Sequence, residues 1–287
     1  MLPNFIVAGA PKSGTTSMYH YLSCHPDIFL PFRKEILFFD SSYYKGISWY
    51  ENIFKGYNSE KVIGDISPNY MHNPYVPKRI FNTIPSAKII FILRNPVERA
   101  YSHYWDLIGW TKTKESFMDM LNNPKMLKRG HSYIEFDILE MGFYYKHITR
   151  FLKYFPMNQI GIFLFDDLLL NKSRFINDIY KSLGVSSKTF EKSTTIKKYH
   201  TRRTNRSKLI GDILVNERLR KMVNIFPAIT YKSARKMYNW MLSMNTKKIN
   251  TRPITSSEID YLLSIYRDDI FRLEKLTSRN LDHWLNI

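Results

Sequence analysis

The chain has 287 residues, 44% hydrophobic and 24% charged, a composition that excludes global disorder and allows a large buried core. Its single cysteine, Cys24, excludes an intrachain disulfide, and no apolar run approaches the roughly 18 residues of a membrane span. The net charge of +18 favours anionic partners such as nucleic acid, phosphorylated cofactors or acidic polysaccharides. Without a secretion signal at Met1, we expect a soluble, cytoplasmic protein of bacterial type, with a luminal fragment as the alternative.

Four short apolar runs have the length and content of buried parallel strands: Phe5–Gly9, Lys61–Asp65, Ala87–Leu93 and Gln159–Phe165. Helical spacing follows three of them, over Thr15–Cys24, Pro96–Gly109 and Asn171–Leu183. From Ser207 on the spacing is helical without obvious strands, most clearly over Ser256–Leu276. This alternation predicts one α/β domain over residues 1–287, a P-loop-like domain with a central parallel sheet flanked by helices and a helical C-terminal region.

The helix after the third predicted strand has a well-marked start. Asn95 can cap it, Pro96 suits its first turn, and Glu98 stands at the capping-box position. The sequence therefore predicts that a helix starts at this point, with Asn95 as its cap.

The turn Gly9–Thr16 lies between the first predicted strand and its helix, and reads Gly-Ala-Pro-Lys-Ser-Gly-Thr-Thr. In this context the backbone N–H groups and the helix dipole converge on one spot, which predicts a phosphate site. A nucleotide-hydrolysing P-loop has lysine after its second glycine. Here Thr15 stands there, and Lys12 lies inside the turn, where it would meet an atom attached to the 5′ phosphate. No aspartate pairs clearly with Thr16 as a metal ligand, so we expect no metal requirement.

The segment Pro11–Thr16 resembles the Pro-Lys-x-Gly-Thr-Thr loop of the sulfotransferases that use 3′-phosphoadenosine 5′-phosphosulfate (PAPS), in which this loop holds the 5′-phosphosulfate. The resemblance implies that Lys12 is catalytic, as the stabiliser of the leaving group. It also implies that the following residues bind the cofactor: Pro11, Lys12, Ser13, Gly14, Thr15 and Thr16.

A second stretch, Arg94–Ser102, resembles the family's Arg-x-Pro-x-x-Arg-x-x-Ser element, which grips the 3′ phosphate of PAPS. Arg94 follows a predicted parallel strand, at the sheet edge where such folds bind ligands. A guanidinium and a hydroxyl can together chelate a phosphate dianion, so Arg94 and Ser102 are expected to bind the cofactor.

A third stretch, Lys34–Asp40, is similar to the Lys-Glu-x-x-Phe-Phe-Asp element of the carbohydrate branch of the family, the Golgi-type and bacterial enzymes related to those that modify heparan sulfate. The glutamate of that element is the general base, which makes Glu35 the candidate that takes the proton of an acceptor hydroxyl. Leu37 stands where many relatives have histidine. If the base lies elsewhere, His72 and His103 are the next candidates.

Gly64–Tyr70 resembles the family's Glu-Lys-Ser-Pro-x-Tyr stretch, with Ile66 in place of the lysine. Either another cation replaces that lysine, or the acceptor is less anionic than heparan sulfate. The basic stretch Lys188–Lys208 falls where relatives place a loop that closes over the nucleotide. Its candidate cofactor-binding residues, among which the sequence does not choose, are Lys197, Lys198, Arg202, Arg203 and Arg206.

The resemblance covers nearly the whole chain and implies a PAPS-dependent sulfotransferase that works by in-line transfer to a hydroxyl or amine. The expected acceptor is a glycan or glycolipid, or else a small metabolite. Two other functions stay open. A P-loop nucleotide-dependent kinase would need a lysine after Gly14, and a basic nucleic-acid-binding protein would need a base-reading motif. Thr15 stands where that lysine would be, and no base-reading motif is present, so we expect no nucleic-acid partner. The lack of a long apolar run predicts no membrane span.

Overall fold

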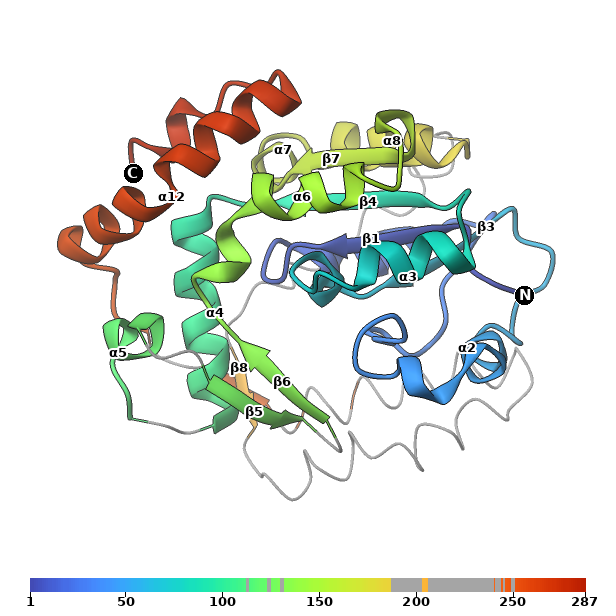
Figure 1. The fold of residues 1–287 in the computed structure, drawn as a ribbon, viewed down its shortest axis with the longest axis horizontal. Coiled ribbons are helices and arrows are strands. Elements are labelled where there is room, and N and C mark those ends of the chain that lie inside the picture. The colour runs from blue at the N-terminus through green and yellow to red at the C-terminus, as the bar shows by residue number, and fades with distance from the viewer. Residues whose placement is uncertain are drawn as a thin grey trace.

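The computed structural model describes residues 1–111, 114–122, 125–129, 132–186, 203–205, 240, 244, 246–248 and 251–287. Within these ranges the centre is a five-stranded parallel sheet with strand order β2-β3-β1-β4-β7 (Figure 1). Its strands are β1 (Phe5–Gly9), β2 (Ile28–Phe29), β3 (Val62–Ile66), β4 (Lys88–Leu93) and β7 (Ile160–Leu164). The four predicted strands are thus confirmed, each end within one residue of its expected position.

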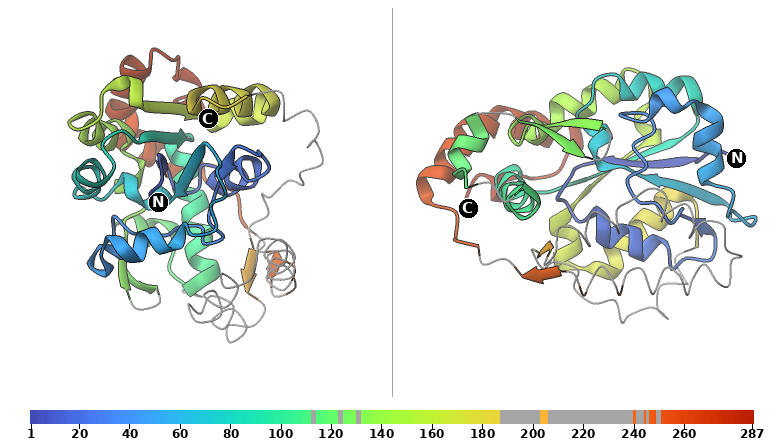
Figure 2. Two further views of the ribbon diagram at one scale, coloured as in Figure 1. Left: turned by 90° about the vertical axis from the view of Figure 1, so that its right-hand side faces the viewer. Right: turned by 90° about the horizontal axis from the view of Figure 1, so that it is seen from below.

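The central strands fill two apolar cores, one on each face of the sheet, because successive side chains of a strand point to opposite faces. In β4, Ile89 and Phe91 enter the first core, while Ile90 and Ile92 enter the second. Figure 2 shows the helices that cover the two faces. The first core contains residues of α2 (Ile47–Ile53), α3 (Val76–Thr83), α4 (Pro96–Thr111), α5 (Phe117–Asn122), α6 (Tyr144–Leu152) and α12 (Ser256–Thr277). The second contains residues of α1 (Thr15–Leu22), α7 (Phe165–Leu170) and α8 (Lys172–Leu183).

The long C-terminal helix α12 confirms the helical spacing of that region. It starts with a capping box, in which Thr255 Oγ1 accepts from the N–H of Glu258 and the Glu258 carboxylate accepts from the N–H of Thr255. Asp269 on α12 accepts hydrogen bonds from the N–H groups of Tyr145 and Lys146, and so caps α6. These contacts hold α12 against α6, at the end of the molecule opposite the N-terminus (Figure 1).

The described residues also form short 3₁₀ helices: η1 (Tyr43–Lys45), η2 (Pro68–Met71), η3 (Glu140–Gly142), η4 (Met157–Gln159) and η6 (Asp282–Trp284). None of the described helices combines the length and the apolar content that crossing a membrane requires.

The predicted helix start is confirmed, since α4 begins at Pro96 and Asn95 caps it, but Glu98 does not act as the capping-box partner. The Glu98 carboxylate binds the guanidinium of Arg94 instead, at 2.9 Å from Nε and 2.8 Å from Nη2. Asn95 Oδ1 accepts from the N–H of Val97. Two contacts with a guanidinium outweigh a single hydrogen bond from a backbone N–H.

The expectation of no strands after Ser207 is wrong, since β9 (Thr246–Lys248) pairs antiparallel with β8 (Arg203–Asn205). The sequence also did not predict the hairpin of β5 (Lys125–Arg129) and β6 (Ser132–Phe136). Three-residue strands are too short to carry an alternating pattern of their own, so tertiary contacts decide them. Phe165, expected to end a strand, begins α7.

Candidate active site

The predicted site residues lie where the central strands end. The turn from Ala10 follows β1, Ser67 follows β3 and Arg94 follows β4. These strands are parallel neighbours, so their carboxyl ends meet at one edge, where open α/β sheets bind ligands.

The turn Gly9–Thr16, the predicted phosphate turn, has the donor set of an anion site. Gly14, the N-cap residue directly before α1, has a φ of 84°, and a Cβ there would lie 2.8 Å from the ring of Phe165, so only glycine fits. Helix α1 has no capping side chain and no acidic residue in its first turn. Its first backbone N–H groups therefore suit a phosphate or sulfate. Ser13 is fully buried, and its hydroxyl has no hydrogen-bond partner among the described residues.

Lys12 makes an ion pair that the sequence did not predict. Its Nζ lies 2.9 Å from Oδ1 of Asp106 on α4. Asp106 follows Ser102 by four residues, so both lie on one face of α4, and this face also includes Glu98. The lysine of the turn thus faces the helix that carries the second predicted phosphate element. The four-residue spacing between Ser102 and Asp106 was the sequence feature that could have placed Asp106 near the site.

Lys34 connects the candidate base to the phosphate turn. Its Nζ donates to Thr16 Oγ1 at 2.8 Å and to Glu35 Oε1 at 3.3 Å. The structure therefore brings Glu35 beside the first turn of α1, as a base for a sulfate bound there requires. The motif alone predicted no role for Lys34, although its position next to Glu35 was a sign that it could contact the candidate base.

Arg94 and the phosphate turn share one aromatic neighbour. The Arg94 guanidinium lies 5.3 Å from the centre of the Phe165 ring, the same ring that covers Gly14. Phe165 at the start of α7 thus joins the two predicted phosphate elements. The Tyr144 hydroxyl donates to the carbonyl of Arg94 at 2.8 Å, which supports the backbone there.

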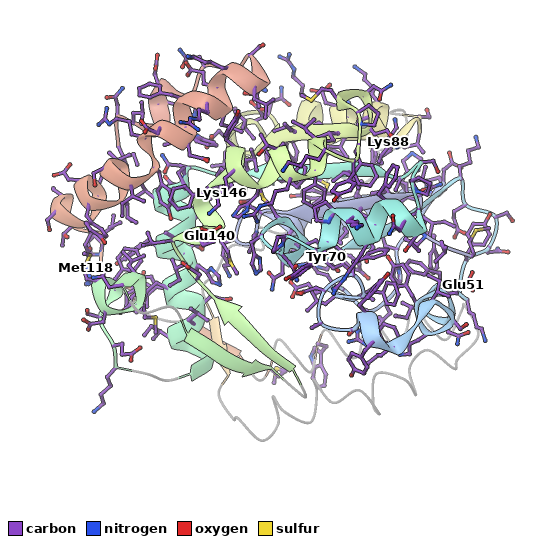
Figure 3. The ribbon with its side chains drawn as sticks, in the orientation of Figure 1. Glu51, Tyr70, Lys88, Met118, Glu140 and Lys146 are labelled. Carbon is purple, nitrogen blue, oxygen red and sulfur yellow. The ribbon has the colours of Figure 1, made fainter. Side chains whose placement is uncertain are left out.

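The two alternative bases lie around buried Arg99. His103 Nδ1 is 3.2 Å from Arg99 Nη1, and both residues are buried. Burial lowers the pKa of His72 to about 4, against the opposing effect of nearby Glu140 and the supporting effect of Arg99. Glu140 itself pairs with Lys146 at 2.8 Å, and both are labelled in Figure 3.

The candidate residues of the basic stretch lie mostly outside the described residues: Lys197, Lys198, Arg202 and Arg206. Arg203 begins β8, and β8 lies against α4. The strand that starts with Arg203 therefore runs beside the helix that carries Ser102 and Asp106.

Comparison with known proteins identifies the same family as the motifs do. The family model of the sulfotransferase domain matches residues 2–223. The membrane-associated sulfotransferase kil1 of Dictyostelium discoideum is 47% identical over 118 residues, which cover 40% of this chain and 25% of that protein. The bifunctional heparan sulfate N-deacetylase/N-sulfotransferase 4 of Mus musculus is 34% identical over 205 residues, which cover 64% of this chain and 22% of that protein. The chain thus spans about a quarter of the length of these curated relatives.

A solved structure has the same fold over the full length. The sulfotransferase from Alicyclobacillus acidocaldarius superposes with a TM-score of 0.69, covering 99% of both chains at 24% identity. The family match includes the phosphate turn, Glu35 and the stretch Arg94–Ser102, and it covers well over half of the chain. The chain therefore belongs to the sulfotransferase family.

Proposed function

We propose that this sulfotransferase moves the sulfuryl group of PAPS to a hydroxyl or amine of a saccharide acceptor. One observation carries the proposal: Lys34 bridges Glu35 and Thr16, so that the candidate base stands beside the turn that suits the phosphosulfate. Relatives named for heparan sulfate N-sulfotransferase activity support a saccharide acceptor. The absence of a cation at Ile66 favours a less anionic acceptor than heparan sulfate itself, such as a neutral glycan or a glycolipid, with a small metabolite as the other option.

The donor is proposed to bind along the sheet edge. Residues Pro11–Thr16 would hold its 5′ end, with the N–H groups at the start of α1 facing the anion. Arg94 and Ser102 would hold the 3′ phosphate, with Arg203 or another residue of the basic stretch closing over the nucleotide. Arg94 now pairs with Glu98, and a phosphate dianion competes well for that exposed pair.

The chain's own residues have three tasks in the proposed in-line transfer. Sulfuryl transfer resembles phosphoryl transfer in its loose transition state, so positioning and charge neutralisation supply most of the catalysis. Lys12 neutralises charge on the departing oxygen. Glu35 takes the proton of the attacking hydroxyl or amine, and Lys34 holds the Glu35 carboxylate next to Thr16.

Residues 1–287 form one sulfotransferase domain, since Ile6 and Trp284 enter the same core. Transfer needs no metal ion, which EDTA treatment of the active enzyme tests. The location is cytoplasmic, which fractionation of the native cells tests.

A screen of acceptor classes with radiolabelled PAPS tests the function directly. We expect label in N-deacetylated heparosan, desulfated glycans or glycolipids, and loss of that label with Glu35→Gln. ATP with magnesium should give no transfer, and random-sequence oligonucleotides should not bind at physiological salt. Transfer from ATP would instead support the kinase, and salt-dependent binding of oligonucleotides would support the nucleic-acid-binding protein.

A further inference from the structure

A fully buried carboxylate lies at the end of β3, next to the loop that carries Glu35. Asp65 is 0% exposed and accepts hydrogen bonds from the hydroxyls of Ser67 at 2.7 Å, Tyr50 at 2.8 Å and Tyr70 at 2.9 Å. Burial raises the pKa of Asp65, while the hydrogen bonds from Ser67, Tyr50 and Tyr70 lower it. Burying a carboxylate costs free energy, but a buried network in which each group is hydrogen-bonded makes the surrounding structure rigid.

Two of these hydroxyls continue into the Glu35 loop. Ser67 Oγ accepts from the N–H of Leu37 at 3.2 Å, and Tyr70 Oη accepts from the N–H of Phe39 at 3.3 Å. A hydroxyl has one proton, so donation to Asp65 leaves its lone pairs for the loop amides. Asp65 therefore sets the direction of both hydroxyls. Tyr70 lies in the packed interior below α3 (Figure 3).

The loop needs such anchors because its backbone is strained. Glu35 has a φ of 59° and Leu37 a φ of 55°, in the left-handed region that residues with side chains rarely adopt. The N–H of Glu35 donates to the carbonyl of Ile66 at 3.0 Å. The N–H groups of residues 35, 37 and 39 thus all bond to the segment around the end of β3.

We propose that Asp65 is a positioning residue for sulfuryl transfer: through Ser67 and Tyr70 it holds the Glu35 loop, and so keeps the Glu35 carboxylate beside Thr16. The inference rests on the proposed role of Glu35 as the base. Asp65 itself is shielded from the acceptor and the donor, since it is completely buried.

The chain offers a matched pair of variants. Tyr50 and Tyr70 are both 0% exposed, and both donate to Oδ2 of Asp65 at nearly the same distance. Tyr70 also accepts from a loop amide, whereas the bond of the Tyr50 hydroxyl in this network is to Asp65. Tyr70→Phe and Tyr50→Phe each remove one hydroxyl and keep the ring, so they separate the link to the loop from the loss of one donor to Asp65.

We expect Tyr70→Phe to lower kcat by about 10- to 100-fold, with the KM for PAPS within about threefold, because a small displacement of a catalytic group costs up to that factor. Both variants should lower Tm by similar amounts, but Tyr50→Phe should keep kcat within about threefold of the parent. In the Glu35→Gln background, Tyr70→Phe should lower kcat no further, because both changes act on one group. Equal losses of kcat for the two tyrosine variants, or an additive loss with Glu35→Gln, would overturn the proposal.

Amide hydrogen exchange of the protein with adenosine 3′,5′-bisphosphate tests the positioning without turnover. In Tyr70→Phe the amides of Glu35 and Leu37, which Tyr70 does not bind directly, should exchange at least tenfold faster than in Tyr50→Phe. Asp65→Asn should show the same change if it folds. Unchanged exchange at these amides would overturn the positioning role. Failure of the parent enzyme to use PAPS would instead overturn the proposed function, and the exchange result would still decide whether Asp65 holds the loop.

Discussion

The amine of Lys12 lies 2.9 Å from the carboxylate of Asp106, so α4 places a negative charge at the lysine of the phosphate turn. Lys12 is 28% and Asp106 40% exposed, and partly exposed pairs of this kind contribute at most about 1 kcal/mol. An anionic ligand therefore competes with Asp106 for Lys12 at little cost.

Asp106→Asn should raise the affinity for adenosine 3′,5′-bisphosphate by about three- to tenfold, because it removes a like charge from the anion site. Titration calorimetry at low and physiological salt measures the change, which should shrink as salt rises. Asp178→Asn on α8, where Asp178 pairs with Arg174 and Lys181, is the charge-matched control. A weaker affinity in Asp106→Asn would mean that Asp106 holds Lys12 in its binding position.

Lys12→Ala tests the leaving-group role of the lysine. Because charge on the departing oxygen grows only in the transition state, the substitution should reduce kcat more than it raises the KM for PAPS. Steady-state kinetics with saturating acceptor separates the two constants. Lys45→Ala in η1 removes the same charge outside the turn and should leave both constants near those of the parent. Unchanged turnover at saturating PAPS would exclude Lys12 as the stabiliser.

Arg94→Ala should weaken the binding of adenosine 3′,5′-bisphosphate at least tenfold, because a charge-assisted contact of about 1.5 to 3 kcal/mol is lost. The affinity for AMP, which has no 3′ phosphate, should hardly change. Glu98→Gln should strengthen the binding of the bisphosphate, since Glu98 now occupies the guanidinium. Calorimetry that gave the parent equal affinity for both nucleotides would contradict the assignment of Arg94.

The sequence predicted the parts of the fold that are locally encoded. β1 and β4 are continuous apolar runs, and α12 repeats its apolar residues at helical spacing, so each is identifiable alone. β2 has two residues and pairs only because β3 lies beside it, which no local pattern indicates. Strands of this kind depend on tertiary contacts.

The same division holds in the site. Lys12, Glu35 and Arg94 stand in contiguous motifs, so they could be proposed as site residues from the sequence. Asp106 and Phe165 reach the site only because α4 and α7 pack against the phosphate turn, which the sequence does not state. At the start of α4, the local pattern predicted the helix start and the Asn95 cap, but it did not predict that Glu98 pairs with the Arg94 guanidinium.

The stability of the C-terminal helix should depend on pH through Glu258. The hydrogen bond from Arg252 lowers the pKa of Glu258 from its ordinary 4.5 to about 2. Because the folded pKa is the lower one, the stabilisation is complete above pH 4.5 and is lost as the pH falls toward 2. Glu258→Gln should cost about 1 to 2 kcal/mol at pH 7, allowing for solvent screening, and almost nothing near pH 2.

Urea unfolding at both pH values measures this difference. Asp260→Asn, at an exposed position of the same helix, is the control and should change stability little at either pH. A cost of Glu258→Gln that stayed constant between pH 7 and pH 2 would assign the loss to packing and to the helix cap instead of to the charge.

Glu35→Gln tests the base itself. The substitution keeps the size and hydrogen-bonding capacity of the side chain but removes its basicity, so kcat should fall by about 10² to 10⁴ while the affinity for PAPS stays nearly intact. Lys34 loses its charged partner yet keeps Thr16, so the loop should remain in place. The acidic limb of the pH profile, which reports protonation of the base, should disappear with the carboxylate.

Glu51→Gln on α2, where Glu51 pairs with the amino terminus, is the matched control and should keep kcat and the acidic limb. If Glu35→Gln retained most of its activity, the proton would be taken elsewhere. Half-buried His72 and His103, which is buried against Arg99, would then be tested next.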